Sequence, residues 1–175
     1  KGITTPEQGF QNQLEFTNFI GNYRVFGTEF LVQKQFKGFY AWVSYCWNNN
    51  QYDFSNFEPS EFPSNYEIRH TIKCAATYEW NSLKVALGAK WYTGRPETVP
   101  LSSDPVYNLE GEPEISYSDP NSSNIGNFFQ VDFSAMYAFR LNKDASVQVG
   151  ASIMNLLNRK NIINRYYRIN NDSNR

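Results

Sequence analysis

Alternating apolar and polar residues predict β-strands along much of this chain. The clearest pair is "TIKCAATYEW" and "LKVALGAKWYTG", which flank Asn81 and Ser82. A two-residue turn there pairs residues whose numbers sum to 163, and this register puts ten apolar side chains on one surface. A slip of one residue would destroy that agreement, so the register is well specified. The surface holds Ile72, Cys74, Ala76, Tyr78, Trp80, Leu83, Val85, Leu87, Ala89 and Trp91.

The same alternation continues on both sides of this hairpin. It predicts further strands over 22–36, 39–47, 128–140 and 146–154, with a weaker candidate at 163–169. Short turns near residues 37, 81 and 143 make the strands that they join antiparallel neighbours. Long polar segments at 48–69 and 95–127 make the other connections. The expected fold class is all-β, with antiparallel up-and-down strands.

The two faces of these strands differ in a way that favours a transmembrane barrel. Aromatic residues lie at both ends of the apolar face, and small or aliphatic residues such as Ala41, Val43 and Ala76 occupy its middle. That order is typical of two aromatic girdles around a lipid band, and short turns opposite long loops are typical of outer-membrane barrels. The other face carries lysines. A lysine facing lipid at the midplane costs roughly 2 to 4 kcal/mol, so this face is expected to line the barrel interior.

Several motifs resemble a known family over residues 22–168. They are "VFGTEF" at 25–30, "RH" at 69–70, "TGRP" at 93–96 and "NLLNRKN" at 155–161, within the longer runs "FFQVDFSAMYAF" and "ASIMNLLNRKNIINRYYRI". In order and spacing the chain resembles the C-terminal part of TonB-dependent outer-membrane receptors. It departs from the family at Gln130 and Val131, where members often have Arg-Leu before the aspartate, and at its end, which lacks the family's terminal aromatic residue.

The resemblance implies a location and an activity. The family builds a barrel of twenty-two strands in the outer membrane, so residues 1–175 are expected to be a partial C-terminal barrel region without plug domain, TonB box or last strand. Such a receptor imports a scarce nutrient, with ferric siderophores, cobalamin, glycans and peptides as substrate classes. The implied partners are the lipid bilayer, the ligand, the inner-membrane TonB complex and, as a candidate, a surface lipoprotein. The expectation includes no enzyme activity and no cofactor.

Composition excludes some classes of function and structure. Sixteen Lys and Arg residues against seventeen Asp and Glu residues give no basic footprint for nucleic acid. Apolar runs are too short for a membrane-spanning helix. A single histidine rules out a multi-histidine metal site. Residue parity puts Cys46 and Cys74 on opposite faces of the sheet, so free thiols are expected.

Two groups of residues are candidate sites. Arg69, His70 and Arg95 lie near the predicted outer rim and are candidates for ligand binding. In the register above, Lys73 faces Lys90, and like charges facing each other are destabilising. Local neutralisation by Asp132 and water, an acidic patch on a plug, and a passing anionic substrate all remain open as the compensating charge.

Three functions are consistent with these patterns. The leading one is a ligand-gated importer. A passive porin or a structural or secretion barrel differs from it by lacking a plug. A soluble β-barrel or sandwich that binds a small apolar ligand differs from both, because its apolar face would point inward.

Overall fold

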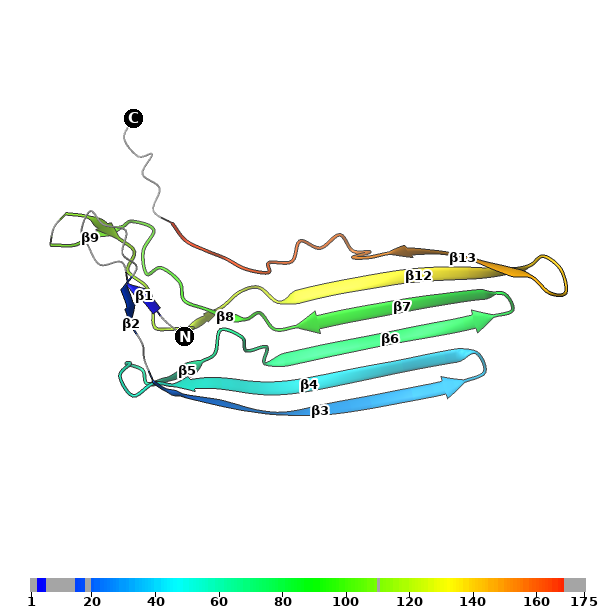
Figure 1. Ribbon diagram of the computed structural model, residues 1–175, viewed down its shortest axis with the longest axis horizontal. Helices are drawn as coiled ribbons and strands as arrows, with labels where there is room; N and C mark the ends of the chain where they lie inside the picture. The colour runs from blue at the N-terminus through cyan, green and yellow to red at the C-terminus, as the bar shows by residue number, and fades with distance from the viewer. Residues whose placement is uncertain (1–2, 6–14, 18–19, 110, 169–175) are drawn as a thin grey trace, which may run out of the picture.

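The computed structural model describes residues 3–5, 15–17, 20–109 and 111–168, with side chains described from residue 20 onward. The described residues form an all-β fold whose main element is a seven-stranded antiparallel sheet (Figure 1). Its order is β13-β12-β7-β6-β4-β3, and β5 pairs with the far end of β4. The strands are β3 (Asn22–Phe36), β4 (Phe39–Asp53), β5 (Glu61–Pro63), β6 (His70–Trp80), β7 (Leu83–Tyr92), β12 (Phe128–Arg140) and β13 (Ser146–Ile153).

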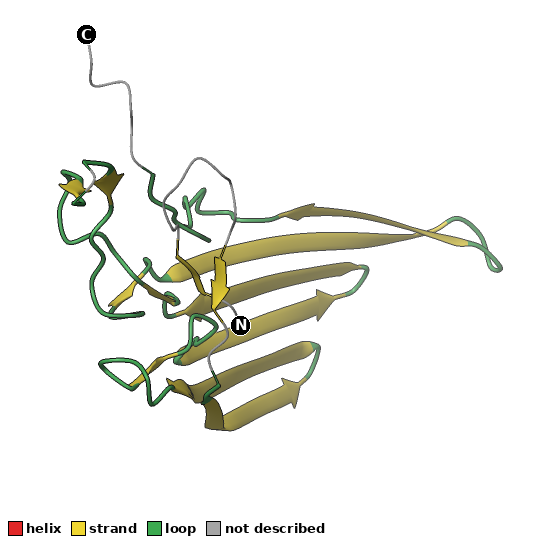
Figure 2. Cartoon of the chain, turned by 60° about the vertical axis from the view of Figure 1, so that its left-hand side comes forward, coloured by secondary structure: helices red, strands yellow, loops and turns green. Residues whose placement is uncertain are grey.

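Short strand pairs accompany the main sheet. They are β1 (Ile3–Thr5) with β2 (Glu15–Thr17), β8 (Pro96–Glu97) with β11 (Ser123–Asn124), and β9 (Val106–Tyr107) with β10 (Pro113–Glu114). Tight turns join the long strands at one end of the sheet, and the long connections gather at the other end (Figures 1 and 2). Within the described residues no pairing joins β3 to β13, so the sheet is open.

The tight turns depend on residues that tolerate a left-handed backbone. Lys37 and Gly38 join β3 to β4 with φ values of 37° and 77°. A Cβ added at Gly38 would lie 2.6 Å from the carbonyl oxygen of Glu79 in the next hairpin, so only glycine fits this close approach. Asn81, with φ of 54°, opens the turn between β6 and β7, as asparagine often does.

The predicted register of the central hairpin is confirmed. Lys73 pairs with Lys90, and Glu79 pairs with Lys84, so the residue numbers sum to 163. The pairings of the neighbouring strands extend the apolar face across the sheet. One row of it runs Val32, Val43, Cys74, Ala89 and Val131.

Two boundaries in the sequence analysis were wrong. Residues 48–53 belong to β4 and not to the following loop, because the outer end of β3 supplies backbone partners down to the Asn22–Asp53 pair. Polar side chains there do not prevent strand formation once a neighbour pairs with the backbone. The expected seventh strand at 163–169 is not a strand over residues 163–168, and residue 169 lies outside the described residues.

In the part of the chain that the structure describes, no second layer covers the apolar face of the sheet. Among the described residues, the buried hydrophobic side chains are Phe62 and Ile125, and both lie in or beside the long connections. Val32 and Leu87, by contrast, are 66% and 49% exposed on the apolar face. Cys46 and Cys74 are free and lie on opposite faces, as expected. No helix among the described residues is long and apolar enough to span a membrane.

Candidate functional site

The polar face carries two adjacent rows of side chains near the long connections. The outer row is Glu29, Cys46, Thr71, Tyr92 and Phe128, and the next row inward is Leu31, Ser44, Lys73, Lys90 and Gln130. We call the second row, together with Tyr92 and Phe128, the lysine patch. Because alternate residues of paired strands share a face, the pairings alone bring these side chains together from five strands.

Lys90 is held by aromatic rings. The rings of Tyr92 and Phe128 stack with centroids 4.5 Å apart and planes 3° from parallel. The Lys90 Nζ lies 5.1 Å from the Tyr92 centroid and 5.6 Å from the Phe128 centroid, within cation–π range. This arrangement fixes the ammonium group at the outer border of the patch, while Lys73 and Lys90 both remain exposed.

Asp132 lies one row further inward and is directed to other partners. Both of its carboxylate oxygens accept hydrogen bonds from Gln130 Nε2, at 2.8 and 3.0 Å. Its Oδ1 also accepts the backbone N–H of Asn155 at 2.8 Å. In its cross-strand pairing it faces Gly88, and it forms no ion pair with either lysine.

Arg69 and His70 have partners at the end of the sheet that carries the long connections. The Arg69 guanidinium forms a salt bridge of 3.1 Å with Glu67, whose side chain is almost fully buried and also accepts the Asn50 N–H. The His70 Nδ1 lies 2.9 Å from the Tyr45 hydroxyl on β4, and the two rings stack. Arg69 therefore orders a buried carboxylate, and His70 ties β6 to its neighbouring strand.

Arg95 binds a segment that is distant in sequence. Its Nη2 donates a hydrogen bond of 2.7 Å to the carbonyl oxygen of Ile163. Two residues further along both segments, Arg165 forms a salt bridge of 2.9 Å with Glu97. The Tyr167 hydroxyl and the Glu97 carboxylate raise the pKa of the Arg165 guanidinium, because both favour its charged form. These contacts attach residues 154–168, here called the C-terminal strap, to the base of the long connection after β7.

Along the C-terminal strap, a backbone hydrogen bond and an asparagine side chain replace the strand ladder. Beyond the last β12–β13 pair, Leu156 N donates to the Val131 carbonyl oxygen at 2.7 Å. Asn161 then accepts the Phe129 N–H through Oδ1 and donates to the Phe129 carbonyl oxygen through Nδ2, both at 2.9 Å. Asn155 and Asn158 adopt positive φ values of 53° and 50°, which form a compact turn between these contacts. An asparagine side chain thus completes the edge of β12 where β13 has ended.

We expect the variant Asn161→Ala to free the outer end of β12. Both backbone groups of Phe129 would lose their partner, and each lost hydrogen bond is worth about 0.5 to 1.5 kcal/mol. Hydrogen exchange on the folded protein should show faster exchange at the Phe129 amide. The control is Asn164→Ala, since among the described residues the Asn164 side chain accepts a hydrogen bond only from the neighbouring Arg165 N–H. Equal exchange rates at Phe129 in both variants would contradict the role of Asn161.

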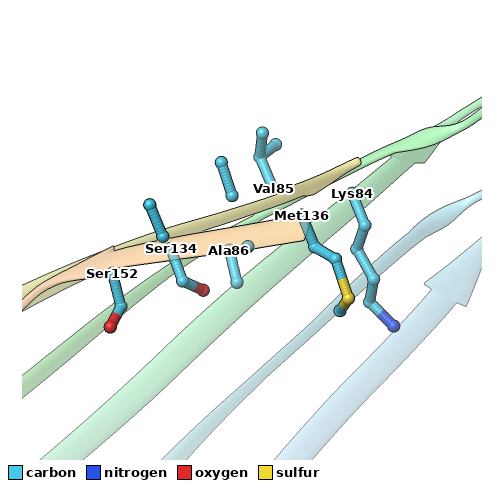
Figure 3. A pocket seen from close by; sticks show the side chains of 9 residues that line it. Lys84, Val85, Ala86, Ser134, Met136 and Ser152 are labelled. Carbon is cyan, nitrogen blue, oxygen red and sulfur yellow. The ribbon is translucent and has the colours of Figure 1, made fainter. Parts of the chain in front are cut away.

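A shallow hollow of about 280 Å³ lies across β7, β12 and β13, closer to the tight turns. Figure 3 shows Lys84 and Met136 side by side and pointing to the same side of the sheet, with Val85 pointing to the other. The hollow forms because small residues such as Ala86 and Ser152 fill little of the space above this part of the polar face. Lys84 faces Glu79 across the hairpin, so its charge has an acidic counterpart that the lysine patch lacks.

An aromatic cluster in the connection after β4 was not expected from the sequence. Phe54, Phe57 and Phe62 pack together with ring centroids 5.6 to 6.0 Å apart, and Tyr52 at the end of β4 joins them. The dense spacing of aromatic residues in 52–62 was the available signal. Beside the cluster, Ser64 and Glu67 are buried, so residues 54–67, which include β5, form a small packed core at the end of β4.

Within the described ranges, no three His, Cys, Asp or Glu side chains gather where they could hold a metal ion. Comparisons with protein-family models, with curated proteins and with solved structures found no match for this chain.

Proposed function

We propose that this chain forms part of the barrel wall of a TonB-dependent receptor, which imports a scarce nutrient across the outer membrane. The proposal rests on the sequence motifs described above and on the uncovered apolar face of the sheet. In this role the apolar face contacts lipid, the polar face lines the lumen, and the long connections face the cell exterior. The inner-membrane TonB complex supplies the energy.

The uncovered apolar face is the observation that carries the proposal. It joins apolar side chains from six long strands without a covering layer among the described residues. Contiguous exposed apolar areas of this kind mark interaction with a membrane or another protein. The row Phe30–Tyr45–Trp91 and the row Phe36–Phe39–Tyr78 are six residues apart along β4, about 20 Å at 3.4 Å per residue. Strands of a membrane barrel tilt by about 35–45°, so this spacing covers roughly 14 to 17 Å along the membrane normal, within the apolar band of about 25 Å.

Between the two aromatic rows, Lys34 is the charged residue on this face. It lies on β3 in the same row as Ala41 and Ala76, one row inward from Phe36. Its long side chain can lie along apolar surface while its ammonium reaches the interface near the tight turns. A lysine this close to the strand end is therefore compatible with a lipid-facing strand.

Cysteine labelling on intact cells tests the membrane orientation. In a variant without Cys46 and Cys74, Ser103→Cys in the long connection should react with a membrane-impermeant maleimide. Ser82→Cys in the tight turn should react only after the outer membrane is made permeable. Equal labelling of both positions in intact cells would contradict the proposed orientation.

Energy dependence separates an importer from a passive pore. Cells that carry the complete receptor should stop accumulating the cargo when the TonB complex is deleted. A porin would continue to let the cargo equilibrate across the outer membrane. Import that persists without TonB would favour the passive alternative.

A further inference from the structure

The lysine patch is a concentration of positive charge that the protein does not neutralise locally. Lys73 and Lys90 are direct cross-strand partners, and side chains so paired have Cβ atoms about 4.5 to 5.5 Å apart. Like charges at this separation repel each other. In the part of the chain that the structure describes, no carboxylate lies within ion-pair distance of either ammonium group.

The nearest acidic side chains on the polar face are committed to other donors. Glu29, in the outer row, accepts a hydrogen bond of 3.0 Å from Ser44. Gln130 is the cross-strand partner of Lys90, yet its Nε2 donates to both oxygens of Asp132. The residue opposite Lys90 is therefore a neutral amide that binds Asp132, and not an acid that could neutralise the lysine.

The position of Lys90 keeps it available to a ligand. The Tyr92–Phe128 stack holds its ammonium by cation–π contact, which leaves the N–H donors without a carboxylate partner. Lys73 is exposed on the adjacent strand. The two ammonium groups can both donate to one anionic group placed between them, and such charge-assisted hydrogen bonds are the stronger kind.

We propose that the lysine patch is a binding subsite for an anionic small molecule, whose carboxylate or phosphate lies between Lys73 and Lys90. In the importer proposed above, this subsite lies just inside the end of the lumen that carries the long connections. The inference rests on that function for its biological meaning, because it assigns an anionic cargo to the receptor. The binding chemistry itself depends only on the residues of the polar face.

Anion binding to the full chain in detergent micelles tests the subsite directly. Citrate and inorganic phosphate serve as the probes, titrated by calorimetry at low ionic strength. The double variant Lys73→Gln/Lys90→Gln should weaken citrate binding by at least about tenfold, since two charge-assisted hydrogen bonds are lost. The charge-retaining variant Lys73→Arg/Lys90→Arg should keep most of the affinity.

Lys84→Gln is the matched control, because Lys84 is an exposed lysine of the same face and strand that already faces Glu79. It should change the citrate affinity by less than about twofold if the effect is specific to the patch. An equal loss in Lys84→Gln, or no binding by the unmodified chain, would overturn the proposal. A zero-length carbodiimide cross-link from Lys73 or Lys90 to a carboxylate elsewhere in the chain would assign the charge to an internal partner and also overturn it.

These outcomes are separate from the test of the proposed function. A protein that labels as an outer-membrane barrel and imports by TonB, yet binds neither probe, would lose only the anionic subsite. A protein that binds citrate through both lysines but fails the labelling test would keep the subsite and lose the receptor function.

Discussion

In the receptor proposed above, placing an arginine at Ala76 should abolish assembly of the folded protein in the outer membrane. Ala76 lies on the apolar face near the middle of β6 and pairs with Ala41 and Leu87, whereas Lys34, which shares its row, is two residues from the end of β3. In a lipid-facing strand, an arginine near the midplane costs roughly 2 to 4 kcal/mol. The amount of heat-resistant folded protein in outer-membrane fractions measures this loss.

The neighbouring Ala75 offers a matched control. Ala75 and Ala76 are the same residue type on the same strand, both half-buried, but Ala75 is on the polar face opposite Trp42 and Gly88. Ala75→Arg should therefore assemble at close to the normal level. Equal loss in the two variants, or a greater loss in Ala75→Arg, would contradict a lipid-facing apolar face.

Replacing Gly94 by alanine should displace the base of the long connection after β7. A Cβ at Gly94 would overlap the carbonyl oxygen of Ile125, a backbone atom that no side-chain rotation can move away. Gly94 is also bound on both sides, with Asn127 accepting its N–H and Asn124 donating to its carbonyl oxygen. Overpacking of this kind costs about 1 to 3 kcal/mol. The rate of proteolytic cleavage within residues 95–127 should rise accordingly.

Gly126→Ala provides the comparison for Gly94→Ala. The nearest atom to a Cβ at Gly126 is the end of the Ile162 side chain, 4.0 Å away, which is an ordinary contact. This variant should keep the normal cleavage rate although it changes the same part of the loop. If it is cleaved as fast as Gly94→Ala, the close backbone approach at Gly94 is not the cause.

Most of the sheet could be predicted because its signals are local. A two-residue turn at Asn81 and Ser82 fixes one register, and the alternation of apolar residues then assigns every face. The end of β4 was missed because Asn48, Asn49 and Asn50 are poor strand formers by type. Their strand conformation depends on pairing with β3, which composition does not reveal.

The contacts of the candidate site were harder to predict than its location. The facing pair of Lys73 and Lys90 followed from the register, but the partners of Asp132 did not. One of these partners is the backbone N–H of Asn155, which a turn just after β13 brings next to Asp132. The partner of Arg95 could not be predicted either, since its hydrogen bond to Ile163 spans 68 positions and no local sequence pattern encodes it.

The aromatic cluster in residues 54–67 has a consequence for antibody recognition. Its rings pack on one another and on Tyr52 at the end of β4, and the backbone of Ser64 is bound to Asn50 in the same strand. A free peptide copying the loop lacks that strand and cannot reproduce the packed arrangement. Antibodies raised against such a peptide should recognise the denatured chain, whereas those raised against the folded protein should read a conformational epitope.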